Sequence, residues 1–230
     1  MDTTTHTEPH AAAFPADCPR ALFITGTDTD AGKSFATGWM AREIAAAGQS
    51  VITQKLIQTG NHDLSEDIDV HRRIMGIPLQ PRDLDHTTAP IILSYPASPD
   101  LAARLDGVEP DFEVAARSTA VLLKEFDNVL LEGAGGLMVP LREDYLTIDY
   151  AADHELPAAV ITNGKLGSIN HTLLTLSALR ERGMKVYAVV YNPYFDRDAT
   201  IAADTRAYLR AYLAKHFAGT HFIEMPAGIA

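Results

Sequence analysis

The stretch from Gly26 to Ser34, with the sequence GTDTDAGKS, constrains the fold more than any other part of the chain. It follows an apolar run at residues 21–24 that is typical of a buried strand, and it leads into residues 35–47, which have apolar side chains at helical spacing. A glycine-rich turn that joins a strand to a helix and ends in Gly-Lys-Ser is typical of a phosphate-binding loop. In such a loop, backbone N–H groups and the helix N-terminus face phosphate oxygens.

The end of this loop carries two side chains suited to a bound nucleotide. Lys33 can reach the terminal phosphates, and the Ser34 hydroxyl can bind Mg²⁺. The segment Thr27 to Ala31 is one residue longer than the strict pattern allows, so the spacing is a variant. The alternative is an ordinary strand-to-helix turn with an exposed lysine, and the flanking strand and helix favour the phosphate-binding loop.

Length and charge limit the classes of protein to consider. The chain has 230 residues, enough for a sizeable core, and a net charge of −11, which argues against nucleic acid or an anionic membrane as partner. We predict a flexible tail over residues 1–20 and one domain over 21–230. No apolar run is long enough to span a membrane, and residues 1–20 lack the features of a signal peptide, so the predicted compartment is the cytoplasm. The single cysteine, Cys18, excludes an internal disulfide and a cysteine-based zinc cluster.

Strand and helix patterns alternate along the whole chain. Further strands are predicted at 51–53, 128–131, 158–161, 186–190 and 221–223. Further helices are predicted at 70–75, 101–105, 112–125, 147–154, 167–183 and 201–217, with an irregular connection over 87–99. This alternation predicts an α/β fold with a doubly wound, mostly parallel sheet and helices on both faces, and the phosphate-binding loop makes that fold P-loop NTPase-like.

Polar residues follow several of the predicted strands. They are Lys55, Glu132, Lys165 and Asn192. Ligand groups gather at the carboxyl ends of parallel strands, so we expect these side chains near the phosphate-binding loop. Glu132 could orient Mg²⁺ or its waters, and glycines follow it that would let the backbone approach a ligand. The alternatives are an exposed lysine at Lys55 and a purely structural Glu-Gly turn.

Two helix starts carry polar groups whose role the residues alone leave open. The acidic residues between Asp63 and Asp69 either cap a helix or include a carboxylate that supports Mg²⁺. Ser168 and Asn170 stand at the start of a predicted helix, where capping and anion binding are compatible.

Taken in order, several stretches resemble the dethiobiotin synthetase family. The resemblance is carried by GTDTDAGKS at 26–34, KLIQTG at 55–60, Asp67, YPASP at 95–99, LLEGAGGLMVPL at 130–141 and KLGSINHTLLTL at 165–176. It implies a homodimeric enzyme, with sites at the subunit interface, that joins CO₂ or bicarbonate to 7,8-diaminononanoate. The reaction closes a cyclic urea at the expense of ATP, with Mg²⁺ as cofactor.

The resemblance also implies roles for single residues. The catalytic pair would be Lys33 and Lys55, and Mg²⁺ would be held by Ser34, Asp67 and Glu132. The substrate would contact Thr59, and its distal carboxylate would be taken by Ser168 and Asn170 across the interface. The nucleotide set is Asp30, Ala31, Gly32, Lys33, Ser34, Phe35, Glu132, Gly133, Ala134, Gly135, Asn192 and Pro226, with the last two at the adenine.

Some positions depart from the family pattern. Asp30 replaces the usual glutamate, Leu56 stands where proline is common, and Asp100 stands where histidine is frequent. The chain also stops at Ala230, close after Pro226, so a short adenine-side segment is expected and the preferred base stays open.

Two other functions compete with the synthetase. A partitioning-type ATPase switch would carry a signature lysine in the loop where Asp28 stands, and it would need a basic patch or a membrane-binding tail. A related amidating ligase would need a catalytic cysteine, but Cys18 lies in the predicted tail. A third reading, a nucleotide-binding module without catalysis, is disfavoured by the presence of Lys33, Lys55, Asp67 and Glu132.

Overall fold

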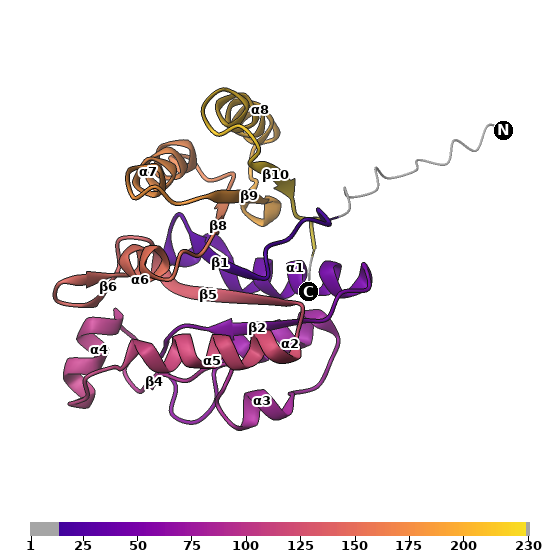
Figure 1. Cartoon of the computed structure of the whole chain (residues 1–230). Helices are drawn as coiled ribbons and strands as arrows, with labels where there is room; N and C mark the ends of the chain where they lie inside the picture. The colour runs from indigo at the N-terminus through magenta and orange to yellow at the C-terminus, as the bar shows by residue number, and fades with distance from the viewer. Residues whose placement is uncertain (1–13, 229–230) are drawn as a thin grey trace.

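A six-stranded sheet runs through the molecule, with its strands in the order β10-β9-β8-β1-β5-β2 and every pairing parallel. The computed structural model describes residues 14–228 (Figure 1). The strands are β1 (Ala21–Gly26), β2 (Val51–Lys55), β5 (Asn128–Gly136), β8 (Ala158–Asn163), β9 (Val186–Asn192) and β10 (His221–Glu224). The predicted P-loop NTPase-like, parallel α/β fold is thereby confirmed.

Alternate residues of each strand point to opposite faces of the sheet, and helices cover a hydrophobic core on each face. In β1, Leu22 and Ile24 pack with Trp39, whereas Phe23 lies in the opposite cluster. The Trp39 face is covered by α1 (Lys33–Ala46) and α2 (Glu66–Met75). The Phe23 face is covered by α4 (Pro99–Asp106), α5 (Phe112–Glu125), α6 (Thr147–Asp153), α7 (Ser168–Glu181) and α8 (Ala199–His216).

Strand register brings distant parts of the chain together at one edge of the sheet. β5 lies between β1 and β2, and within these pairs Glu132 is opposite both Ile24 and Lys55. β1 then ends at Gly26, where the predicted phosphate-binding loop begins. The loop, Lys55 and Glu132 therefore meet at the carboxyl end of three adjacent strands, as the sequence predicted.

Several short elements have no counterpart in the sequence prediction. They are β3 (Gln58–Thr59) paired with β4 (Ile92–Leu93), β6 (Pro140–Arg142) paired with β7 (Tyr145–Leu146), α3 (Pro81–Leu84), and the 3₁₀ turns η1 (Thr29–Ala31) and η2 (Pro193–Phe195). The helix predicted from Val70 begins earlier, at Glu66, because the Ser65 hydroxyl caps it by accepting from Ile68 N. Asp67 therefore lies in the first turn of α2 and not before it. None of the helices within residues 14–228 is long and apolar enough to cross a bilayer.

The predicted flexible tail, residues 1–20, needs a correction in its second part. Residues 1–13 lie outside the described residues, but Phe14 is 7% exposed and packs against Trp39 and Tyr187. The Asn128 amide further donates to the carbonyl oxygens of Cys18 and Pro19. Residues 14–20 are thus attached to the domain. The free energy gained by burying the Phe14 ring exceeds the cost in conformational entropy of ordering this short segment.

One buried ion pair fixes α2 against the segment that follows it. Arg72, which is 1% exposed, donates from Nε and Nη2 to the two carboxylate oxygens of Asp83, each at 2.8 Å. Burial raises the pKa of Asp83, but the hydrogen bonds and charge of Arg72 outweigh it and hold that pKa below its usual value. Breaking such a pair leaves a charge buried without a partner.

We therefore expect Asp83→Asn to lower the free energy of unfolding by roughly 3 kcal/mol, and the midpoint of thermal unfolding by roughly 6–12 °C. The Asp83 contribution is present above the ordinary carboxyl pKa and is lost as pH falls through the lowered one. The difference between wild type and variant should thus be constant from about pH 7 to 5 and shrink below about pH 4. Circular dichroism recorded during heating at several pH values measures the unfolding midpoint and its dependence on pH.

Asp69→Asn is the matched control, because Asp69 pairs with Arg73 on the exposed side of the same helix. It should cost less than about 0.5 kcal/mol. An equal loss in the two variants would contradict the assignment.

Candidate active site

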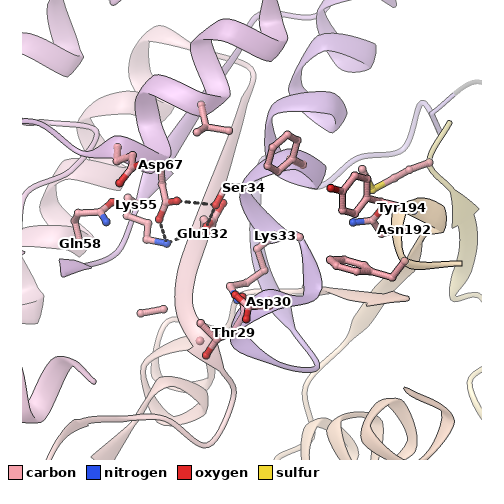
Figure 2. A pocket seen from close by; sticks show the side chains of 18 of the residues that line it. Thr29, Asp30, Lys33, Ser34, Lys55, Gln58, Asp67, Glu132, Asn192 and Tyr194 are labelled. Atoms are coloured by element: carbon pink, nitrogen blue, oxygen red, sulfur yellow. Dashed lines mark hydrogen bonds and ion pairs between the residues drawn. The ribbon is translucent and has the colours of Figure 1, made fainter. Parts of the chain in front are cut away.

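The residues predicted to bind a metal come from three separate elements and touch one another. The Ser34 hydroxyl, at the start of α1, lies 2.7 Å from Asp67 Oδ1 of α2 and 3.0 Å from Glu132 Oε1 of β5. Figure 2 shows these three side chains facing one another beside the cavity. The three side chains that the family resemblance assigned to Mg²⁺ therefore lie in contact, and their binding of the metal stays a prediction.

Lys55 joins the same cluster from the end of β2. Its Nζ lies 2.5 Å from Asp67 Oδ2 and 2.9 Å from Glu132 Oε1, and donates to the Gly133 carbonyl at 3.2 Å. The side chain is 5% exposed. Lys55 is therefore not the exposed lysine of the alternative interpretation.

The opposite charges of Lys55 and the two carboxylates stabilise one another in this buried cluster. Burial alone would raise the pKa of Glu132, but the Lys55 charge and a hydrogen bond from His71 outweigh it and hold that pKa well below its usual value. Burial alone would lower the pKa of Lys55, and the charges of Glu132 and Asp67 raise it instead. Lysine and glutamate therefore both stay ionised near neutral pH.

Lys33 is placed differently. Its Nζ donates to the carbonyl oxygens of Asp28 and Thr29, each at 3.1 Å, so it folds back over its own loop. Burial lowers the pKa of Lys33 to about 8. With Lys55 across the cluster, two cationic groups flank the space between the loop and Glu132 (Figure 2).

The donors fit a hard divalent cation. Within residues 14–228 no three His, Cys, Asp or Glu side chains converge on one point, so a metal would not be held by protein carboxylates alone. Ser34, Asp67 and Glu132 offer a hydroxyl and two carboxylates, the oxygen ligands that Mg²⁺ takes when nucleotide phosphates and water supply the rest. The residues present therefore fit the predicted Mg²⁺.

A cavity of about 680 Å³ collects most of the predicted nucleotide and substrate residues. Its lining includes Asp30, Gly32, Lys33, Ser34, Phe35, Lys55, Thr59, Asp67, Glu132, Ala134, Gly135, Asn192 and Pro226. Ala31 and Gly133 are buried beside it without lining it. Asp30, which replaces the family's glutamate, is exposed at the cavity.

The far end of the cavity is formed by η2 and the strand before it. Asn192 is 5% exposed, and its amide is used on both sides: Nδ2 donates to Ala31 O at 3.3 Å, and Oδ1 accepts from Tyr194 N at 3.0 Å. Tyr194 lies beside Asn192 at this end (Figure 2), and Phe195 and Met225 also line the cavity. Each amide group retains one further N–H or lone pair for a ligand.

Ser168 and Asn170 do not join the other predicted residues. They stand at the N-terminus of α7, outside the lining of the 680 Å³ cavity. Ser168 is 4% exposed, and its hydroxyl has no hydrogen-bond partner among the described residues, whereas Asn170 is exposed. A buried hydroxyl without a partner beside free helix N–H groups is suited to an anion.

Sequence reasoning missed two residues that touch Glu132. Thr37 Oγ1 and His71 Nε2 each lie 2.8 Å from Glu132 Oε2. Helical spacing could have revealed them, because Thr37 lies three residues after Ser34 and His71 four residues after Asp67.

Comparisons with known proteins point the same way as the site. A family model described as an AAA domain matches residues 20–219. The ATP-dependent dethiobiotin synthetase BioD 2 of Pasteurella multocida is 47% identical over 203 residues, which are 88% of this chain and 95% of that protein. The ATP-dependent dethiobiotin synthetase BioD of Chlorobaculum tepidum is 49% identical over 197 residues, covering 86% of this chain and 82% of that protein.

Solved structures with low identity share the fold. FtsY from Elizabethkingia anophelis in complex with GDP matches 96% of this chain with a TM-score of 0.56 at 12% identity. Chloroplast FtsY from Physcomitrella patens matches 94% with a TM-score of 0.53 at 14% identity. This chain spans only 62% and 61% of those two chains, respectively, and the likeness shows the fold alone.

Gly32 in the phosphate-binding loop can be used to test the role of the loop. Its φ is 89°, and a Cβ added to it would lie 2.2 Å from Asn192 Nδ2. We expect Gly32→Ala to displace the loop and to weaken ATP binding roughly tenfold or more, because charge-assisted hydrogen bonds from its N–H groups are lost. Isothermal titration calorimetry measures the dissociation constant.

Gly48 provides the control, since its φ is 87° and nothing lies within 4 Å of an added Cβ. Gly48→Ala should share the cost of a left-handed alanine, about 1–3 kcal/mol of stability, and keep normal ATP affinity. Similar affinities for the two variants would show that the contact with Asn192 does not matter.

Proposed function

The chain belongs to the ATP-dependent dethiobiotin synthetase family and has that family's ligase activity in biotin biosynthesis, with ATP as co-substrate, and we propose how its own residues carry it out. The proposed substrates are 7,8-diaminononanoate and CO₂, and the product is the cyclic urea dethiobiotin. The observation that supports this assignment in the structure is the meeting of Lys33, Lys55, Asp67 and Glu132 around one cavity. We propose the cytoplasm as the compartment, because the reaction consumes ATP.

The reaction divides into three steps in which atoms and charges balance. One amine of the diamine attacks CO₂ with its lone pair, forms an N–C bond and loses a proton, which gives a carbamate. A carbamate oxygen then attacks the γ-phosphorus of ATP while the bond to ADP breaks. The second amine attacks the carbonyl carbon of the resulting anhydride and loses a proton to solvent, and phosphate leaves with the bonding electrons. No side chain has to act as a nucleophile.

The described residues are suited to hold the negative groups of this reaction. Lys33 would turn from its loop carbonyls to the phosphates, and Lys55 would face the carbamate and the phosphoryl group that it attacks. Ser34, Asp67 and Glu132 would hold Mg²⁺, which when bound neutralises charge on the β- and γ-phosphates. Thr59, at the cavity wall, would contact the diamine or the carbamate.

The substrate's distal carboxylate needs a second site, and we propose that a second copy of the chain provides it. Ser168 and Asn170 do not line the cavity that holds Lys55 and Glu132, which supports a role for them in the site of a second copy. Exposed apolar side chains of Met138 and Leu174 line a hollow of about 390 Å³ between the loop and α7. An apolar face of this kind next to a site is suited to a two-fold interface between identical chains.

The assignment is tested by measuring phosphate release from Mg-ATP with bicarbonate, with and without 7,8-diaminononanoate, while dethiobiotin is followed by mass spectrometry. We expect release to depend on the diamine and to match dethiobiotin formation. Lys55→Ala should lower kcat by roughly 10³-fold, because it removes a buried charge from the developing phosphoryl group. Lys124→Ala, which changes an exposed lysine near the end of α5 and outside the cavity lining, is the control and should keep most of the activity. Release that ignores the diamine, without dethiobiotin, would refute the proposal.

Asn170→Asp tests the shared site. The added charge should raise the KM for the diamine roughly 10- to 100-fold with little change in ATP affinity, because it repels the carboxylate. A mixture refolded or coexpressed with Lys55→Ala should recover about a quarter of wild-type activity at low diamine, since half of the dimers are mixed and each holds one intact site. No recovery in proven mixed dimers would mean that each chain completes its own site.

A further inference from the structure

The two oxygens of Glu132 have different surroundings. Oε1 faces the cavity, where Lys55 Nζ and the Ser34 hydroxyl lie at 2.9 and 3.0 Å. Oε2 faces the interior, where His71 Nε2 and Thr37 Oγ1 both lie at 2.8 Å. Glu132 and His71 are each 0% exposed, so no solvent molecule competes for the inner oxygen.

Of the two side chains near Glu132 Oε2, His71 is the one that must donate a hydrogen bond to it. Thr37 has one hydroxyl proton and two acceptors within reach, Lys33 O at 2.9 Å and Glu132 Oε2 at 2.8 Å. A carboxylate only accepts, so the His71 contact at 2.8 Å requires a proton on Nε2. The inner oxygen therefore depends chiefly on the imidazole.

The proton on His71 is assigned by its other neighbours. Arg72 Nη1 donates to Thr53 Oγ1 at 2.8 Å, because a guanidinium has no acceptor. The Thr53 hydroxyl thus has its own proton free for His71 Nδ1, which lies 2.9 Å away. A ring that accepts at Nδ1 and donates from Nε2 satisfies every group in the chain Arg72, Thr53, His71, Glu132.

This chain of hydrogen bonds is anchored far from the cavity. Arg72 is held by both oxygens of Asp83, which also accepts from Thr88 Oγ1 at 2.7 Å and from Gln80 N at 2.7 Å. The imidazole therefore has a fixed position and a fixed tautomer. One helix, α2, supplies Asp67 to the cluster and, one turn later, the residue that holds the second carboxylate.

We propose that His71 is a positioning residue that fixes the Glu132 carboxylate, so that Oε1 is presented to the divalent cation accompanying the nucleotide. This inference rests on the proposed Mg²⁺-nucleotide site but not on the identity of the organic substrate. Groups that hydrogen-bond to metal-binding carboxylates set their orientation, and their loss typically weakens metal binding 10- to 100-fold. The alternative is a core histidine that only satisfies its own polar atoms.

The test compares His71→Leu with His71→Gln, because glutamine keeps an N–H that can reach Glu132 and leucine does not. For each variant, calorimetry gives the affinity for the non-hydrolysable analogue β,γ-imido-ATP in excess Mn²⁺ and again in EDTA. The ratio of the two affinities reports the metal contribution. General damage to the fold lowers both affinities and leaves the ratio unchanged.

We expect His71→Leu to lower this ratio about tenfold or more, and His71→Gln to restore most of it. An unchanged ratio in His71→Leu, with reduced thermal stability alone, would leave His71 a structural residue and overturn the proposal. Equal losses in folded Leu and Gln variants would overturn it as well, because the donated hydrogen bond would then be irrelevant.

Thr53→Val decides the matter if His71→Leu does not fold. It removes the hydroxyl that fixes the imidazole and should lower the ratio several-fold, whereas an unchanged ratio would overturn the proposal. The control is Thr119→Val, because the Thr119 hydroxyl donates to the Gln54 side chain. Gln54 follows Thr53 in β2, and its side chain points to the opposite face of the sheet. Thr119→Val should cost similar stability and keep the ratio; a reduced ratio there would also count against the proposal.

These measurements contain no diamine, so they separate this inference from the proposed reaction. If the ratio responds as expected but no dethiobiotin forms, only the reaction assignment fails. If dethiobiotin forms and the ratio does not respond, only the role of His71 fails.

Discussion

An ionised carboxylate without solvent contact is the constraint on which the rest of this structure depends. Glu132 is 0% exposed, and burying a charge is costly unless it is paired and hydrogen-bonded. Its compensation comes from three elements: Ser34 and Thr37 of α1, Lys55 of β2, and His71 of α2. The loop helix, the neighbouring strand and the acidic helix are thus held together by one side chain. Formation of the site and correct packing of these elements are the same event.

Much of the fold and site could be predicted because it depends on local patterns. The apolar strands, the glycine-rich loop and the polar residues after strands 51–53 and 128–131 indicate a parallel sheet with ligand groups at one edge. Sheet order then places Lys55 opposite Glu132, a pairing that follows from insertion of β5 between β1 and β2. The resemblance added the choice of Asp67 among several nearby acids, which local patterns had left open.

What could not be predicted depends on contacts between distant segments. The pairing of Arg72 with Asp83, and the depth at which His71 lies, follow from where α2 packs and not from its own sequence. The sequence around Phe14 suits a flexible tail, and only the folded structure brings its ring against Trp39 and Tyr187. The predicted start of α2 at Val70 is too late because Ser65 caps the helix, and the acidic residues that follow it suit both a loop and a first turn.

The doubly engaged amide of Asn192 has a consequence for molecular discrimination. A free asparagine can rotate by half a turn and exchange its oxygen for its nitrogen, and so adapt to bases with opposite hydrogen-bonding order. Here rotation would break the bonds to Ala31 O and Tyr194 N together. The amide therefore has a fixed polarity: a ligand that bonded to it would have to match its order of donor and acceptor, because the side chain would not adjust to the ligand.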